Sequence, residues 1–109
     1  MAKIDSEAGE SQLKLLLRQQ PDTAYLHFAL GNIYGNQQRW SEAQNAYFNA
    51  LQLAKTDPDY AYNLAVSLEH LGKPEAAITY YQRALANSRD TRANFDRQRV
   101  RQRIEVLGQ

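Results

Sequence analysis

The side chains that carry catalytic or metal-binding chemistry are few in this chain and poorly spaced for either. His27 and His70 are the only histidines, and there is no cysteine. Neither histidine has a second one three or four residues away, the spacing that puts two metal ligands on one helix face. Asp57 and Asp59 flank a proline at a helix start, where capping explains the carboxylates without acid–base chemistry. We therefore expect a protein that is not an enzyme and needs no metal or cofactor.

Length and charge limit the remaining classes. The 109 residues are enough for one domain, and 13 basic against 12 acidic residues give a net charge of +1. Such a balance gives no overall electrostatic reason to bind nucleic acid or an anionic membrane. No apolar run approaches the roughly 20 residues of a membrane span, and the first residues lack the apolar core of a signal peptide. The composition favours a soluble domain with a packed core.

An internal repeat organises the chain. When the sequence is shifted against itself so that Leu30 falls on Leu64, residue types match over one full period. The further matches are Gly31 with Ala65, Tyr34 with Leu68, Ala43 with Ala77, Tyr47 with Tyr81, Ala50 with Ala84 and Leu51 with Leu85. Within each copy these residues recur at intervals of three and four, which is helical periodicity. Each copy is therefore predicted to be a helix, a short turn and a second helix.

Capping and turn residues bound the helices. We expect helices at 22–37 and 41–54 in the first copy, and at 58–71 and 74–88 in the second. Two further helices are expected at 7–19 and 96–107. Pro58 is suited to the first position of a helix that Asp57 caps, because its nitrogen would have no partner there.

The spacing and types of these residues resemble the tetratricopeptide repeat, a helical hairpin of about 34 residues. The resemblance implies an all-α solenoid, here a single domain over residues 1–109. It would contain a half-repeat helix at 7–19, repeats at 24–57 and 58–91, and a capping helix at 96–107. His27 and Ala61 depart from the family's pattern, which has a large aromatic residue at this position.

The resemblance also implies a function, because such repeats stack into a superhelix whose concave face is lined by the first helix of each repeat. We expect this groove to bind a protein or peptide ligand. Phe28 and Tyr62 are one repeat period apart and would present two equivalent aromatic surfaces, or would simply shield the helix interface. The candidate partner-binding residues are Tyr25, Phe28, Asn32, Tyr62, Asn63, Val66 and Arg97.

One subset of the family holds the C-terminus of a peptide in a clamp for two carboxylates. Position by position, this chain supplies Asn32, Asn63 and Arg97 for that clamp. It has Phe28 and Ala93 where the family's two lysines belong. Without these ammonium groups most of the charge-assisted bonding is lost, so the full clamp is not expected.

Three alternatives remain open. Leu13, Leu16, Val100 and Ile104 on the terminal helices could form a homodimer interface. The segment from Arg83 onward, with seven arginines against three acidic residues, could bind an acidic protein or, with less support, RNA. The repeats also resemble those of bacterial envelope and pilus-assembly proteins, which would place the chain in the envelope as a soluble domain rather than in the cytoplasm, the default.

Overall fold

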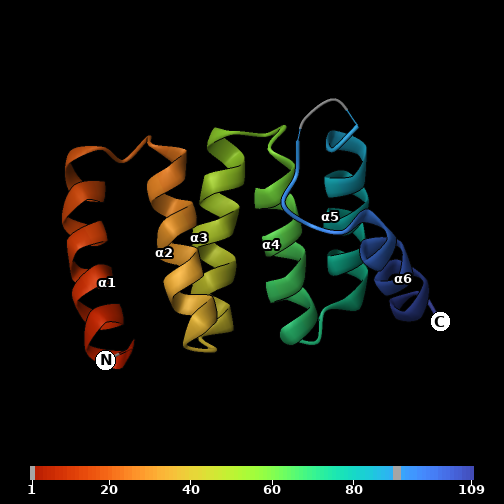
Figure 1. Cartoon of the computed structure of the whole chain (residues 1–109), viewed down its shortest axis with the longest axis horizontal. Helices are drawn as coiled ribbons and strands as arrows, with labels where there is room; N and C mark the ends of the chain where they lie inside the picture. The colour runs from red at the N-terminus through yellow and green to blue at the C-terminus, as the bar shows by residue number, and fades with distance from the viewer. Residues whose placement is uncertain (1, 90–91) are drawn as a thin grey trace.

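The computed structural model describes residues 2–89 and 92–109, with side chains from residue 7 onward (Figure 1). In this part of the chain there are six α-helices and no strand. The helices are α1 (Ala2–Gln19), α2 (Ala24–Asn36), α3 (Trp40–Leu53), α4 (Pro58–His70), α5 (Pro74–Asn87) and α6 (Arg97–Leu107).

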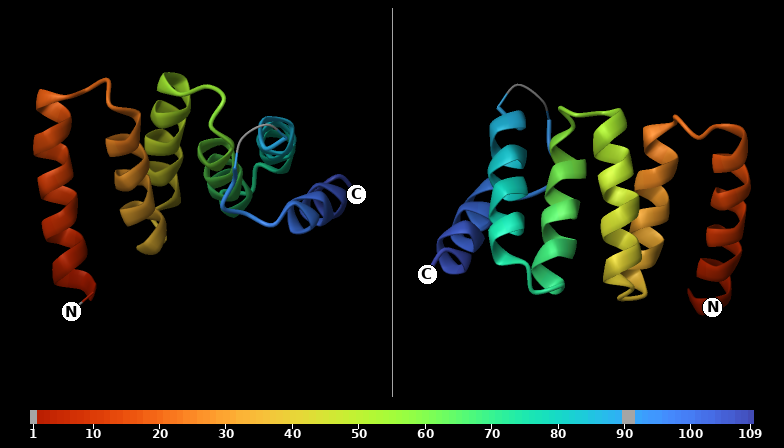
Figure 2. Two further views of the ribbon diagram at one scale, coloured as in Figure 1. Left: turned by 45° about the horizontal axis from the view of Figure 1, so that its top comes forward. Right: turned by 180° about the vertical axis from the view of Figure 1, so that it is seen from behind.

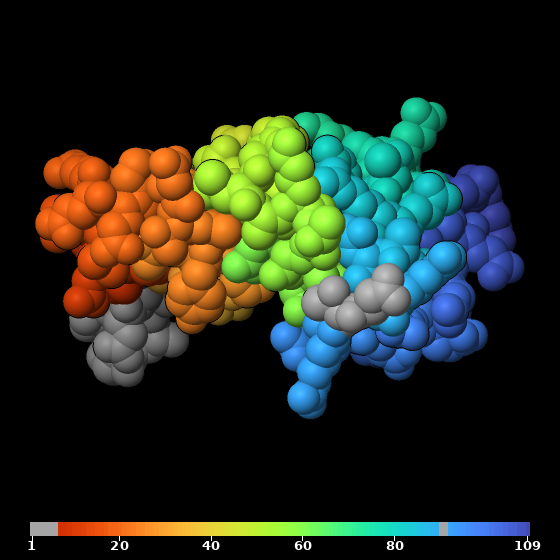
Figure 3. Space-filling model, turned by 90° about the horizontal axis from the view of Figure 1, so that it is seen from above, coloured from red at the N-terminus to blue at the C-terminus, as the bar shows by residue number. Residues whose placement is uncertain are grey.

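The helices form a solenoid. Contacts are densest within the hairpins α2–α3 and α4–α5, α3 packs on α4, and α1 and α6 pack on α2 and α5 at the two ends. The chain measures 40 × 27 × 21 Å, and its helices follow one another along the long axis (Figures 1 and 3). Figure 2 shows α6 running obliquely to the neighbouring α5 in its right-hand view, and in its left-hand view α5 is seen nearly end-on while α1 is seen lengthwise, so the helix direction also turns along the solenoid. The predicted all-α solenoid is confirmed.

The helix bounds follow the capping signals closely. The four repeat helices begin and end within two residues of the predicted positions. The first helix differs, because it begins at Ala2 rather than at residue 7. The apolar stripe that predicted it starts only at Leu13, but no proline precedes that stripe, and the helix continues through Gly9. Residues 90 and 91, at the end of the predicted second repeat, lie outside the described residues.

Two aspartates cap helices as their sequence context indicates. The Oδ1 atom of Asp57 accepts hydrogen bonds from the backbone nitrogens of Asp59 (2.9 Å) and Tyr60 (3.2 Å), with Pro58 at the first position of α4. Asp96 accepts equivalent bonds at the start of α6. These caps satisfy backbone donors that have no acceptor within the helix.

Small residues facing tyrosines allow each hairpin to close tightly. Ala43 and Ala77 have no exposed surface, and Tyr47 and Tyr81 are buried. A β-carbon added at Gly31 would lie 2.6 Å from two ring atoms of Tyr47. The first hairpin therefore requires glycine at this position unless the ring moves, whereas Ala65 is accommodated at the equivalent position of the second.

The tyrosine hydroxyls are satisfied although their rings are buried. Tyr47 donates a hydrogen bond to Oδ1 of Asn32 (2.7 Å), and Tyr81 donates one to Oε1 of Glu69 (2.9 Å). Burial raises the pKa of Tyr47 to about 12. For Tyr81, burial and the Glu69 carboxylate raise the pKa further. Both phenols therefore keep their protons in the folded state at pH values where a free tyrosine would begin to lose its proton.

Arg39 joins α1 to the first repeat. Its guanidinium bonds Glu10 of α1 (2.8 Å) and Glu42 of α3 (2.6 Å), and it lies 4.5 Å from the ring centre of Tyr34. Hydrogen bonds from Lys14 and Arg39 hold the pKa of Glu10 below its ordinary value. This network fixes the N-terminal helix, whose apolar contact with α2 is smaller than the contacts within the hairpins.

The apolar side chains of the terminal helices that were candidates for a homodimer interface are largely covered by the chain itself. Val100 is 1% exposed, and Leu13, Leu16 and Ile104 are half-buried. Val100 is thus part of the chain's own core and is not available for a dimer interface. Among the described side chains of the terminal helices, the large apolar ones that are exposed are Leu15 (57%) and Val106 (53%).

The turns between the helices of the two hairpins provide a matched test of backbone strain. Gln38 and Gly72, one repeat period apart, have φ values of 60° and 71°, and both are exposed. In this left-handed region a residue with a β-carbon is destabilised by about 1–2 kcal/mol relative to glycine. Part of this advantage of glycine is lost, because glycine gives the unfolded chain more conformational entropy. We expect Gln38→Gly to stabilise the protein by about 0.5–1 kcal/mol and Gly72→Gln to destabilise it by a similar amount. Urea unfolding measures both, and effects of the same sign would contradict the expectation.

The tight contact between helices predicts intolerance of added volume. Replacing Ala77 by leucine should lower the free energy of unfolding by about 1–3 kcal/mol, because no space surrounds the buried methyl group. Ala86→Leu, at an exposed position of the same helix, is the control and should change stability by less than about 0.5 kcal/mol. Equal urea midpoints for the two variants would contradict this packing.

The raised pKa of Tyr47 predicts a loss of stability in alkaline solution. Between pH 10, the ordinary pKa of tyrosine, and pH 12, the unfolded chain releases the Tyr47 proton while the folded chain retains it. The free energy of unfolding should therefore fall as the pH rises through this range. Tyr47→Phe removes this contribution, so its stability should fall less steeply with pH than that of the wild type. Parallel pH profiles from thermal unfolding would show that the burial of Tyr47 does not govern its ionisation.

Candidate binding groove

Three cavities surround α4, and we name each by its polar lining. The arginine cavity, of about 340 Å³, is lined by Tyr62, Val66, Glu69, His70, Tyr81, Arg99, Val100, Gln102 and Arg103. The acidic cavity, of about 310 Å³, is lined by Tyr25, Phe28, Asp57, Asp59, Tyr60, Tyr62, Asn63 and Asn94. The amide cavity, of about 330 Å³, is lined by Asn32, Gly35, Asn36, Trp40, Tyr47, Asn63 and Val66.

The three cavities share side chains of α4 and so adjoin one another. Tyr62 lines both the arginine and acidic cavities, Asn63 both the acidic and amide cavities, and Val66 both the amide and arginine cavities. We call the combined surface the groove. Its walls come from α2 on one side and from α6 and the segment before it on the other.

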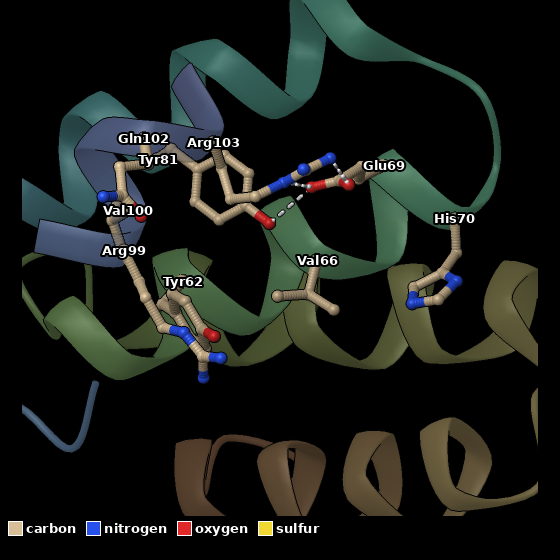
Figure 4. A pocket seen from close by; sticks show the side chains of 9 residues that line it. All are labelled: Tyr62, Val66, Glu69, His70, Tyr81, Arg99, Val100, Gln102 and Arg103. Atoms are coloured by element: carbon tan, nitrogen blue, oxygen red, sulfur yellow. Dashed lines mark hydrogen bonds and ion pairs between the residues drawn. The ribbon is translucent and has the colours of Figure 1, made fainter. Parts of the chain in front are cut away.

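The arginine cavity has an apolar floor and a charged rim (Figure 4). The ring centre of Tyr62 lies 5.9 Å from that of Tyr81 and 4.8 Å from that of Phe95. On the rim, Glu69 accepts hydrogen bonds from the Tyr81 hydroxyl and from the guanidinium of Arg103. The Glu69 carboxylate thus links α4, α5 and α6.

The acidic cavity lies at the N-terminal end of α4. The rings of Phe28 and Tyr60 are 4.7 Å apart, and the carboxylates of Asp57 and Asp59 lie on the same cavity. Asp59 accepts two hydrogen bonds from Asn94, one from the backbone nitrogen (2.7 Å) and one from the side-chain amide (3.1 Å). These bonds fix the segment before α6 against α4.

Neutral groups line the amide cavity. The Oδ1 atom of Asn32 accepts the Tyr47 hydroxyl, and no acceptor in the described part of the chain bonds its Nδ2 group. Trp40 stacks on the imidazole of His70, with ring centres 3.9 Å apart and an interplanar angle of 3°. The cavity therefore combines an aromatic wall with an amide donor suited to a peptide carbonyl.

Most of the residues predicted for partner binding lie on the groove. Tyr25, Phe28, Asn32, Tyr62, Asn63 and Val66 each line at least one cavity. Tyr25 is 66% exposed, whereas Phe28 and Tyr62 are half-buried and pack on other rings. The two rings therefore shield the helix interface and also line the groove, and their contact with a ligand stays a prediction.

Arg97, which was also predicted for partner binding, lies outside the groove. It lines none of the three cavities, and its guanidinium donates a hydrogen bond to the backbone carbonyl of Ser88. This bond links the start of α6 to the residue after α5. The family's clamp position is therefore occupied here by a side chain that already has an acceptor.

Arg99 and Arg103 were not predicted as groove residues, because composition alone does not distinguish them from the other arginines of the segment from Arg83 onward. A signal was present for Arg103, which lies one full repeat period after Glu69. No comparable signal marked Arg99, whose place on the cavity depends on the inclination of α6.

Other kinds of site find little support among residues 2–89 and 92–109. Side chains are described for residues 7–89 and 92–109, and these contain no group of three or more histidine, aspartate or glutamate side chains placed to hold a metal ion. Within residues 2–89 and 92–109 no helix combines the length and apolar character needed to cross a bilayer. His27 is used structurally, with Nε2 at 2.8 Å from the carbonyl oxygen of Pro21.

Three solved structures have a similar arrangement of helices. The type III secretion translocator chaperone SycD of Yersinia enterocolitica has a TM-score of 0.86 and 15% identity, over 97% of this chain and 74% of that one. A type III secretion complex from Aeromonas hydrophila has a TM-score of 0.86 and 16% identity, over 95% and 70%. A CopN–Scc3 complex has a TM-score of 0.77 and 17% identity, over 96% and 58%. At these identities the likeness establishes the fold.

Comparison at the level of sequence agrees with the repeat. No curated protein matches the chain. The family model described as tetratricopeptide repeat matches it twice, over residues 5–58 and 28–91. These overlapping matches cover most of the chain and include both hairpins. The chain belongs to the tetratricopeptide repeat family.

Proposed function

We propose that the chain is a non-catalytic interaction module that binds a peptide segment or a partner helix in its groove. The observation that carries the proposal is the convergence of three adjoining cavities on Tyr62, Asn63 and Val66. Together they offer a concave surface long enough for several residues of a ligand, rather than a single closed pocket for a small molecule.

The lining has the composition of a protein-binding surface. Tyrosine and tryptophan contribute large contact areas with few rotatable bonds, and arginine is the charged residue most enriched at such surfaces. Tyr62, Trp40 and Arg99 provide these types here. Asn32 and Asn63 can bond the backbone of a ligand independently of its side chains.

The similar structures support this proposal, because one is described as a translocator chaperone and two as complexes. All three share the fold, although not the sequence, of this chain. We extend only the general role of protein binding to this chain, and we retain a place in bacterial envelope or pilus assembly as a prediction from the residue pattern.

Self-association is a second candidate. Leu15 on α1 and Val106 on α6 are more than half exposed at opposite ends of the solenoid, so an end-to-end contact between copies would bury them. Light scattering during size exclusion, at high micromolar concentration, tests this. A dimer that Leu15→Lys or Val106→Lys abolishes is expected under this alternative, and a monomer throughout excludes it.

The groove proposal predicts a selective loss of binding. Peptides selected from a random phage-displayed library on the wild-type chain should bind Tyr25→Ala/Val66→Ala at least about tenfold more weakly, because two groove anchors are removed. The matched control is Phe48→Ala/Leu53→Ala, which also removes one aromatic and one aliphatic side chain. Phe48 and Leu53 are exposed on α3 and line none of the three cavities.

Fluorescence anisotropy with the selected peptides measures the affinities, and circular dichroism melts confirm that both double variants are folded. The control should bind within about twofold of the wild type. Equal losses in both double variants, or selection of no peptide on the wild-type chain, would contradict binding in the groove.

A further inference from the structure

Charge is unevenly distributed along the groove. Two carboxylates, those of Asp57 and Asp59, line the acidic cavity, while neutral side chains line the amide cavity. The arginine cavity has two guanidinium groups on its rim and one carboxylate, that of Glu69. The electrostatic potential therefore changes from negative at the N-terminal end of α4 to positive beside α6.

The positive charge of the arginine cavity is not neutralised internally. Glu69 is already bonded by Arg103 and by the Tyr81 hydroxyl. Arg99 is exposed, and among the described side chains and backbone groups of residues 7–89 and 92–109 no carboxylate or carbonyl oxygen bonds its side chain. Figure 4 shows the difference: dashed lines join Arg103 to Glu69, whereas none joins Arg99 to another labelled side chain.

An apolar surface lies next to the guanidinium of Arg99. Tyr62 and Val66 are half-buried, Val100 and Tyr81 are buried, and all four line the cavity. A large apolar side chain placed here would lose most of its contact with water. It would also reduce solvent screening of the neighbouring charge, and a charge-assisted bond gains strength in such a setting.

We propose that Arg99 selects ligands in which an aspartate or glutamate adjoins a large apolar residue, with the apolar side chain in the arginine cavity and the carboxylate on the Arg99 guanidinium. This inference rests on the proposed function of the groove and names the chemistry of its ligand. Arginine suits the role because its planar fork can donate two parallel bonds to one carboxylate.

The carboxylates of the acidic cavity favour the same placement of the ligand's acidic residue beside Arg99. A ligand carboxylate in the acidic cavity would face Asp57 and Asp59, and like charges repel. The acidic part of the ligand is therefore directed toward α6. A ligand with acidic residues at one end would bind in one direction only.

A thermodynamic cycle tests the proposal. A peptide is selected from a random phage-displayed library on the wild-type chain, and a second peptide is made in which the acidic residue beside the large apolar residue is replaced by its amide. Both are measured by fluorescence anisotropy against the wild type, Arg99→Gln and Arg101→Gln. Arg101 is an exposed arginine of the same helix that lines none of the three cavities, so its variant has the same net charge as Arg99→Gln.

Neither variant should disturb the helix. Arg99 is the third residue of α6, where glutamine is favourable because its side chain can bond back to the capping residue. The ion pair of Arg103 with Glu69 remains in both variants. Thermal melts of the three proteins provide the check.

The outcomes separate this proposal from the proposed function. With the wild type and with Arg101→Gln, the change from acid to amide should weaken binding about tenfold; with Arg99→Gln it should weaken binding less than about twofold. An equal effect in all three proteins, or selected peptides without an acidic residue, would overturn the role of Arg99 while leaving groove binding intact. Failure to select any peptide on the wild-type chain would instead count against the groove itself and, with it, this proposal.

Discussion

The fold depends on the close approach of the two helices in each hairpin, which a small residue on one helix and a tyrosine ring on the other make possible. In the first hairpin the Tyr47 ring leaves no space for a β-carbon at Gly31, and Tyr81 takes the equivalent position in the second. The same tyrosines end at the groove, where their hydroxyls bond Asn32 and Glu69. Packing and ligand-facing chemistry are therefore coupled, because the rings that close the hairpins also hold two polar side chains of the groove in place.

The regular repeat ends before α6, and this departure creates the arginine cavity. Three contacts join the last part of the chain to α4: Asn94 with Asp59, Phe95 with Tyr62, and Arg103 with Glu69. In each contact the two partners are separated in the sequence by one repeat period or nearly so. The C-terminal segment therefore covers α4 in the way a further repeat would, but at an inclination that leaves a cavity of about 340 Å³ between α6 and the second hairpin.

The sequence predicted the features that recur in both repeats. Leucine, alanine and tyrosine at constant offsets have one physical explanation, the packing of stacked hairpins, and they indicated the four repeat helices to within two residues. The candidate groove followed as far as it lies on the first helices, which include Phe28, Asn32 and Tyr62. Arg99 could not be found in this way, because its position depends on the non-repeating inclination of α6. Nor could periodicity show that Phe28 and Tyr62 pack on neighbouring rings, since a groove floor and a helix interface require the same residue type.

The differences between the repeats also explain why the groove is asymmetric. Several packing positions are identical in both copies, as at Ala43 and Ala77, whereas several equivalent groove positions differ in charge or polarity. Asn32 corresponds to Val66, Gly35 to Glu69 and Tyr25 to Asp59. Two hairpins with the same groove residues would offer a ligand two equivalent halves. Both copies form the same kind of helical hairpin but present different charges to the groove, and under the proposed function that difference is what can give a bound segment a direction.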